Sequence, residues 1–102
     1  MYSKTNPTIN FAEFIKAILQ ITNFKSLRGR EYKVISVEDG VMNFIRLSSG
    51  KKWSMNLEKL LVAYKELKEF KTEAFRPYVP RTHSPALGLL LHLDLLKKYE
   101  TN

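Results

Sequence analysis

A group of cationic residues in the middle of the chain is the part of the sequence best suited to chemistry. Between positions 25 and 52, seven basic residues outnumber three acidic ones, so this segment carries +4 of the total net charge of +7. Lysine and arginine neutralise phosphates, and each such contact releases counterions and contributes to affinity. The basic residues of the segment are Lys25, Arg28, Arg30, Lys33, Arg46, Lys51 and Lys52.

Three residues of the same region could contact bases. Trp53, the only tryptophan, offers a ring that can stack on a base. Arg46 and Asn43 have side chains that can read guanine and adenine in the major groove of B-DNA, which admits an antiparallel ribbon of strands. We therefore predict non-enzymatic nucleic-acid binding through a basic antiparallel sheet, with double-stranded DNA favoured over RNA.

A structural interpretation of these residues competes with the functional one. A lone tryptophan next to an arginine is often the packed edge of a core, and the ring then only holds the guanidinium. In that case Lys33 and Arg46 extend from the rim of the core into water.

The C-terminal helix supports a second hypothesis, a protein-interaction or oligomerisation module. Its sequence from Ala86 to Leu96 is apolar on nearly every side of a helix. Such a helix is either central to the core or shared with another subunit. A homodimer that binds DNA would combine both hypotheses. The candidate interface residues are Leu87, Leu90, Leu91 and Leu95.

A third hypothesis is a metal-independent ribonuclease. His83 could act as general base or acid, and Arg81 could stabilise the charge that develops on a phosphate. The sequence fixes no second catalytic group near His83, so we expect no enzyme and assign no catalytic residue.

Turn signals predict a three-stranded antiparallel sheet over residues 31–38, 41–48 and 51–55. Asp39-Gly40 is typical of a type I′ turn between two strands. The pairing that follows places Val37 opposite Met42 and Lys33 opposite Arg46. A second turn at Ser49-Gly50 would place Trp53 beside Arg46, so that Lys33, Arg46, Lys51 and Trp53 cluster at one end of one face. A shift of one residue would move Trp53 to the other face.

Helical periodicity and capping residues predict helices over about 10–23, 57–70 and 85–98. Asn10 with Glu13 forms a capping box, and Asn56 can cap the second helix. We predict a single α+β domain over residues 1–102, in the order α-β-β-β-α-α, with the helices packed on one face of the sheet.

Several classes of function are not expected from this sequence. The absence of cysteine removes thiolate metal sites and thiol nucleophiles, and it suits a cytoplasmic location. No common catalytic or nucleotide-binding motif is present, so we expect no cofactor and no metal. The longest apolar stretch is shorter than the about 20 residues that span a bilayer, so we expect no membrane partner.

Overall fold

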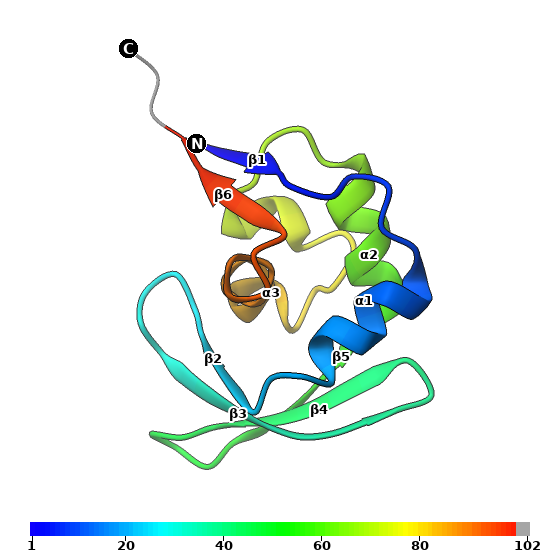
Figure 1. The fold of residues 1–102 in the computed structure, drawn as a ribbon. Helices are drawn as coiled ribbons and strands as arrows, with labels where there is room; N and C mark the ends of the chain where they lie inside the picture. The colour runs from blue at the N-terminus through cyan, green and yellow to red at the C-terminus, as the bar shows by residue number, and fades with distance from the viewer. Residues whose placement is uncertain (100–102) are drawn as a thin grey trace.

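Four antiparallel strands form the main sheet, in the order β2-β3-β4-β5 (Figure 1). The computed structural model describes residues 1–99. The strands of this sheet are β2 (Asn23–Lys25), β3 (Glu31–Glu38), β4 (Val41–Arg46) and β5 (Lys52–Asn56). A second, two-stranded sheet pairs β1 (Tyr2–Lys4) with β6 (Leu96–Lys98).

The helices cover one face of the main sheet and leave its other face open (Figure 1). They are α1 (Phe11–Ile18), α2 (Leu57–Glu66), α3 (His83–His92) and the short 3₁₀ helix η1 (Thr72–Phe75). The capping box is confirmed, since Asn10 Oδ1 accepts from the Glu13 amide at 2.8 Å and Glu13 Oε1 accepts from the Asn10 amide at 3.3 Å. Asn56 caps α2 by accepting from the Lys59 amide at 3.0 Å.

The first hairpin forms as the sequence predicts. Asp39 and Gly40 have φ angles of 50° and 74°, which are the left-handed values that a type I′ turn requires. Val37 is paired with Met42, as expected.

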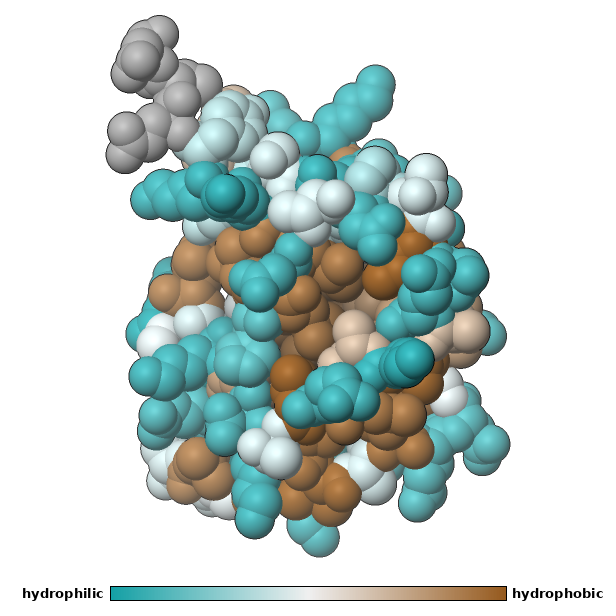
Figure 2. All heavy atoms as spheres, viewed as in Figure 1, coloured by the Kyte–Doolittle hydropathy of each residue, from teal (hydrophilic) through white to brown (hydrophobic). Residues whose placement is uncertain are grey.

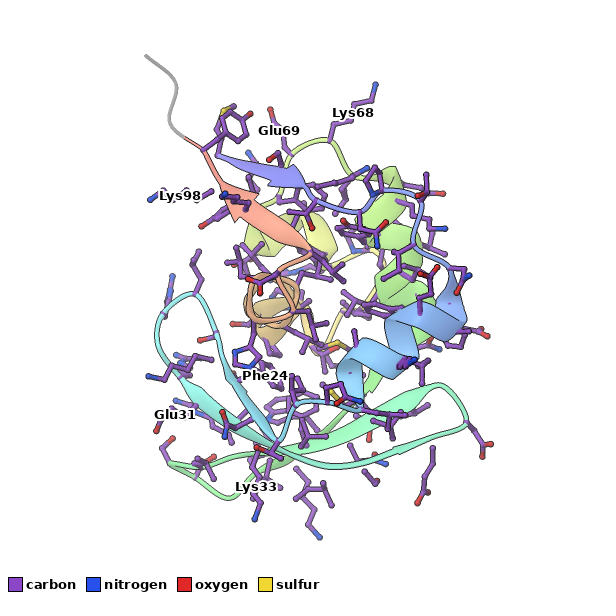
Figure 3. The ribbon with its side chains drawn as sticks, viewed as in Figure 1. Phe24, Glu31, Lys33, Lys68, Glu69 and Lys98 are labelled. Carbon is purple, nitrogen blue, oxygen red and sulfur yellow. The ribbon has the colours of Figure 1, made fainter. Side chains whose placement is uncertain are left out.

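The core lies between the inner face of the main sheet and the helices. The inner face contributes aromatic rings that contact each other, with Phe24 stacked on Tyr32 at 5.2 Å and tilted against Phe44 at 5.6 Å. Phe24 points from the sheet toward the helices, whereas Lys33 points away from them (Figure 3). Hydrophobic residues also gather between the sheet and the helices on the side of the molecule shown in Figure 2.

The buried Tyr64 joins the two-stranded sheet to the core. Its hydroxyl accepts from the Asn6 amide at 3.1 Å and donates to the Leu95 carbonyl at 2.8 Å. One side chain of α2 thus holds the segments next to β1 and β6.

The apolar helix α3 is central to the core. Leu87 and Leu90 are fully buried, Leu95 just beyond the helix is buried, and Leu91 is partly buried. The leucines that we considered for a subunit interface are thus mostly enclosed within the chain itself. Packing within one chain accounts for the apolar character of this helix.

The element order differs from the predicted α-β-β-β-α-α. The first helix ends at Ile18 rather than near residue 23, because Asn23–Lys25 pairs with β3 and makes the sheet four-stranded rather than three-stranded. The second helix ends at Glu66 rather than at residue 70.

The last helix runs over His83–His92 instead of 85–98. Asp94, with a φ of 59°, ends this helical region, and the chain continues into β6. Among residues 1–99, no helix has the length and apolar character needed to cross a membrane.

Gly88 lets α3 approach the backbone of β2. A Cβ at this position would lie against the carbonyl oxygen of Lys25 and 2.6 Å from the Cα of Ser26. Both obstacles are backbone atoms, so the helix or the strand would have to move.

We expect Gly88→Ala to lower the free energy of unfolding by about 1–3 kcal/mol, the usual cost of overpacking. The sign of this change tests the close contact, because replacing glycine with alanine inside a helix otherwise stabilises a protein by about 1 kcal/mol. Urea unfolding followed by circular dichroism measures the change. His92→Ala, at an exposed position of α3, is the control and should change stability by less than about 0.5 kcal/mol. A stabilised Gly88→Ala variant would contradict the close approach.

Candidate nucleic-acid interface

A β-bulge at Ile35 decides which side chains share a face of the main sheet. Val34 is paired with Phe44, but the next pair is Ser36 with Asn43, so Ile35 is an extra residue in β3. Residues on the two sides of a bulge no longer follow one alternation. Lys33 therefore lies opposite Ile45, and the predicted pairing of Lys33 with Arg46 is wrong.

Lys33, Ile45 and Lys52 form one row across the open face. Lys33 is paired with Ile45 on β4, and Ile45 is paired with Lys52 on β5. Paired residues of antiparallel strands point to the same side. Two lysines thus stand on the face that no described helix covers, with Ile45 between them.

Arg46 and Trp53 lie on the opposite, inner face, at one corner of the sheet. Arg46 is paired with Tyr32, and Trp53 with Phe44, both of which belong to the core. Lys51 Nζ lies 4.5 Å from the centre of the Trp53 ring. Arg46 Nε and Trp53 Nε1 are buried donors without a protein partner in the described part of the chain.

The second hairpin is longer than predicted, although Trp53 stays on the expected face. The Arg46 amide donates to the Lys51 carbonyl at 2.9 Å, so four residues separate the paired positions instead of two. Trp53 consequently pairs with Phe44 rather than Arg46. A shift of two residues preserves the face, because side chains alternate with a period of two.

The predicted cluster of Lys33, Arg46, Lys51 and Trp53 is therefore divided. Lys33 stands on the open face, whereas Arg46 and Trp53 belong to the inner face. This division supports the structural interpretation of Trp53 as a packed edge of the core.

Asn43 belongs to a polar chain that crosses three strands of the open face. Its Nδ2 donates to Ser36 Oγ at 3.1 Å, and its Oδ1 accepts from Ser54 Oγ at 2.6 Å. Both halves of the amide are therefore engaged within the protein. Reading adenine would require Asn43 to break both hydrogen bonds.

The remaining predicted cations lie toward the β2–β3 loop. Lys25 Nζ is 3.7 Å from Glu31 Oε1, and both side chains are exposed. Arg28 and Arg30 belong to the loop and line a polar hollow with Glu73 and His83 at the start of α3. They are not part of the row on the open face.

A larger hollow runs along β5 and extends across the open face to Asn43 and Ser36. It includes Ile45, Trp53 and Ser54 and continues past Arg81 to a second hollow beside Asn56 and Lys59. Among residues 1–99, no carboxylate lines either hollow. The cations that line them are Lys51, Lys52, Lys59 and Arg81.

Arg81 and His83 do not form a joint site. Arg81 lies in the hollow along β5, whereas His83 lines the hollow next to Arg28. His83 Nδ1 is 2.6 Å from the Pro80 carbonyl oxygen, which can only accept, so Nδ1 carries the proton. Nε2 is 3.3 Å from an Arg76 amino group and 3.9 Å from a Glu73 carboxylate oxygen, so both ring nitrogens have neighbours within the protein.

Residues 1–99 contain no group of three or more histidine and carboxylate side chains arranged to hold a metal ion. Comparison with protein-family models, curated proteins and solved structures gives no match.

Sequence reasoning missed Arg81 as a member of the hollow along β5. It is separated from β5 by α2 and by the proline-containing segment that follows α2. No periodicity links the two positions, so only the fold shows that they are neighbours.

Tyr78, which lines the second hollow beside Asn56 and Lys59, donates to Glu66 Oε2 at 2.9 Å. This hydrogen bond raises the pKa of Tyr78 above its ordinary value of 10.0, with further contributions from desolvation and from the Glu66 charge. A raised pKa favours the protonated phenol in the folded chain. The protonated Tyr78 phenol therefore stabilises the folded chain. This contribution is fully present below the ordinary pKa and is lost as pH rises through the higher pKa of the folded chain.

We expect Glu66→Gln to lower the pKa of Tyr78 toward its ordinary value, because the charge that opposes phenolate formation is removed. The ultraviolet absorbance of phenolate, followed against pH, measures the pKa of the tyrosines. Subtracting the titration curve of the Tyr78→Phe variant gives the contribution of Tyr78 alone. Identical titration curves for the unaltered chain and Glu66→Gln would contradict the contact.

Proposed function

We propose that the chain is a non-enzymatic nucleic-acid-binding domain that contacts duplex DNA with the open face of its main sheet. The observation that carries the proposal is the row of Lys33, Ile45 and Lys52 on a face that no described element covers. The net charge of +7 favours a polyanionic partner.

The spacing of the two lysines suits a duplex. They stand on β3 and β5, two strand spacings apart, which is about 10 Å. The major groove of B-DNA is about 12 Å wide and admits a β-ribbon. Lys25, on β2, adds a third cation toward the edge of this face, although Glu31 partly offsets its charge.

A duplex fits this face better than a single strand does. Proteins that bind single strands offer aromatic rings on which bases stack. The strand alternation places the rings of Phe24, Tyr32, Phe44 and Trp53 on the inner face. The open face instead presents lysine, serine, asparagine and the aliphatic side chains of Ile45 and Val41, together with Glu31 and Glu38 nearer its borders.

Phosphates rather than base edges are the expected contacts. Asn43 has both halves of its amide engaged, and Arg46 stands on the inner face. Lysine contacts to phosphate position a protein on DNA without carrying sequence information. We therefore infer binding with little dependence on sequence.

Neither alternative hypothesis has comparable support. The leucines of α3 and its C-terminal side are mostly buried within the chain, so they offer little surface for a second subunit. Arg81 and His83 line different hollows, so a ribonuclease would lack the joint site that the chemistry needs.

We expect the double variant Lys33→Ala/Lys52→Ala to bind a random-sequence DNA duplex more weakly than the unaltered chain at every salt concentration. The slope of log affinity against log salt should fall by about 1.8, since each lost phosphate contact removes about 0.9. Fluorescence anisotropy of a labelled duplex measures both quantities.

Lys68→Ala/Lys98→Ala is the matched control, because it removes the same charge at the end of the molecule opposite to Lys33 (Figure 3). It should reproduce the affinity and salt slope of the unaltered chain. An equal loss in both double variants would mean that only net charge matters, and the proposed face would be wrong.

A further inference from the structure

The two edges of the main sheet differ in how they are covered. At the β2 edge, α3 packs so closely at Gly88 that an added Cβ would meet the backbone of Lys25 and Ser26. At the β5 edge, the residues Tyr78 to Thr82 leave a hollow between themselves and the strand.

The β5 edge has backbone groups that no other strand within residues 1–99 pairs with. The Arg46 amide pairs with the Lys51 carbonyl, and the Leu57 amide pairs with the Gly40 carbonyl. Hydrogen-bonded positions of an antiparallel ladder alternate, so the N–H and C=O groups of Trp53 and Met55 face β4. The N–H and C=O groups of Lys52 and Ser54 consequently point away from β4, at the outer edge of the sheet.

The charge of this edge defines the partner. Lys51, Lys52, Lys59 and Arg81 line the two hollows along this edge, and no carboxylate of residues 1–99 lines either of them. A second copy of the chain would bring the same lysines against each other, which is how natural proteins prevent pairing between edges. A strand that carries carboxylates meets no such repulsion.

We propose that β5 is a docking edge for an extended acidic peptide, which adds to the main sheet as a fifth strand. The strand has five residues, so it accommodates a partner of about that length in β-strand addition. Residues opposite Lys52 and Ser54 share their open face, so acidic side chains at those positions lie beside the Lys52 ammonium. The backbone amides of the same acidic residues are the ones that donate to β5.

Three labelled synthetic hexapeptides test the docking edge by fluorescence anisotropy at low salt. The first alternates glutamate and valine, the second replaces each glutamate with lysine, and the third carries N-methyl groups on its glutamates. We expect binding of the first peptide alone. N-methylation keeps the charge but removes the amides that pair with β5.

Two substitutions of Ser54 distinguish the effect of losing its backbone amide from the effect of losing its side chain. Ser54→Pro removes the outward amide, whereas Ser54→Ala keeps it, and both lose the hydrogen bond to Asn43. We expect Ser54→Ala to bind the acidic peptide like the unaltered chain and Ser54→Pro to bind it about two- to tenfold more weakly, the loss of one backbone hydrogen bond. If Ser54→Pro fails to fold, the N-methylated peptide still decides the question.

Substitutions of single cationic residues show where on the protein the peptide binds. Arg81→Ala should weaken its binding about two- to fivefold, the range of an exposed ion pair. Lys33→Ala should leave it unchanged, because Lys33 stands two strands away. The peptide can therefore bind even if the open face proves not to bind DNA.

Three outcomes would overturn the proposal. Equal binding of the N-methylated peptide would show attraction by charge without strand addition. No binding of the acidic peptide would mean that the edge lysines only guard against association. An oligothymidylate whose binding falls in Ser54→Pro but not in Ser54→Ala would assign this edge to nucleic acid instead.

Discussion

The close contact between α3 and β2 determines much of the remaining structure. Gly88 brings the helix close to the backbone of Lys25 and Ser26, and a Cβ at this position would force the helix or the strand to shift. The helix then covers one edge of the main sheet and lies at the centre of the core, where its leucines are buried. Because that edge is covered, β5 is the edge that remains open, and the two binding surfaces that we propose adjoin it.

The bulge at Ile35 has an equally large effect on the distribution of charge. One extra residue in β3 sends Lys33 to the open face while Tyr32 and Val34 stay with the core. Ile35 itself is 56% exposed, as expected of a residue displaced from the ladder. Without the bulge, side chains would alternate between the two faces along the whole of β3. Lys33 would then lie on the inner face with Trp53 instead of on the open face with Lys52.

Local signals predict more of this fold than of its candidate site. The Asp39-Gly40 turn and the Asn10 and Asn56 caps depend on neighbouring residues only, so the hairpin and the helix starts follow from the sequence. Phe24 fits helical spacing as well as it fits a strand, and its pairing with β3 decides the outcome. Val34 and Ile35 are adjacent apolar residues, so the alternation alone does not decide which of them faces the core. Lys33 therefore lies on the opposite face from Arg46 and Trp53, and Arg81 joins the hollow along β5 through contacts distant in the chain.

The pairing of β1 with β6 brings together the first and the last strand of the described chain. Tyr2 pairs with Lys98 and Ser3 with Lys97. The Tyr64 hydroxyl forms hydrogen bonds with Asn6 and Leu95, in the segments next to these strands. Closing so long a loop costs chain entropy before it gains contacts, so this pairing should be among the last events of folding.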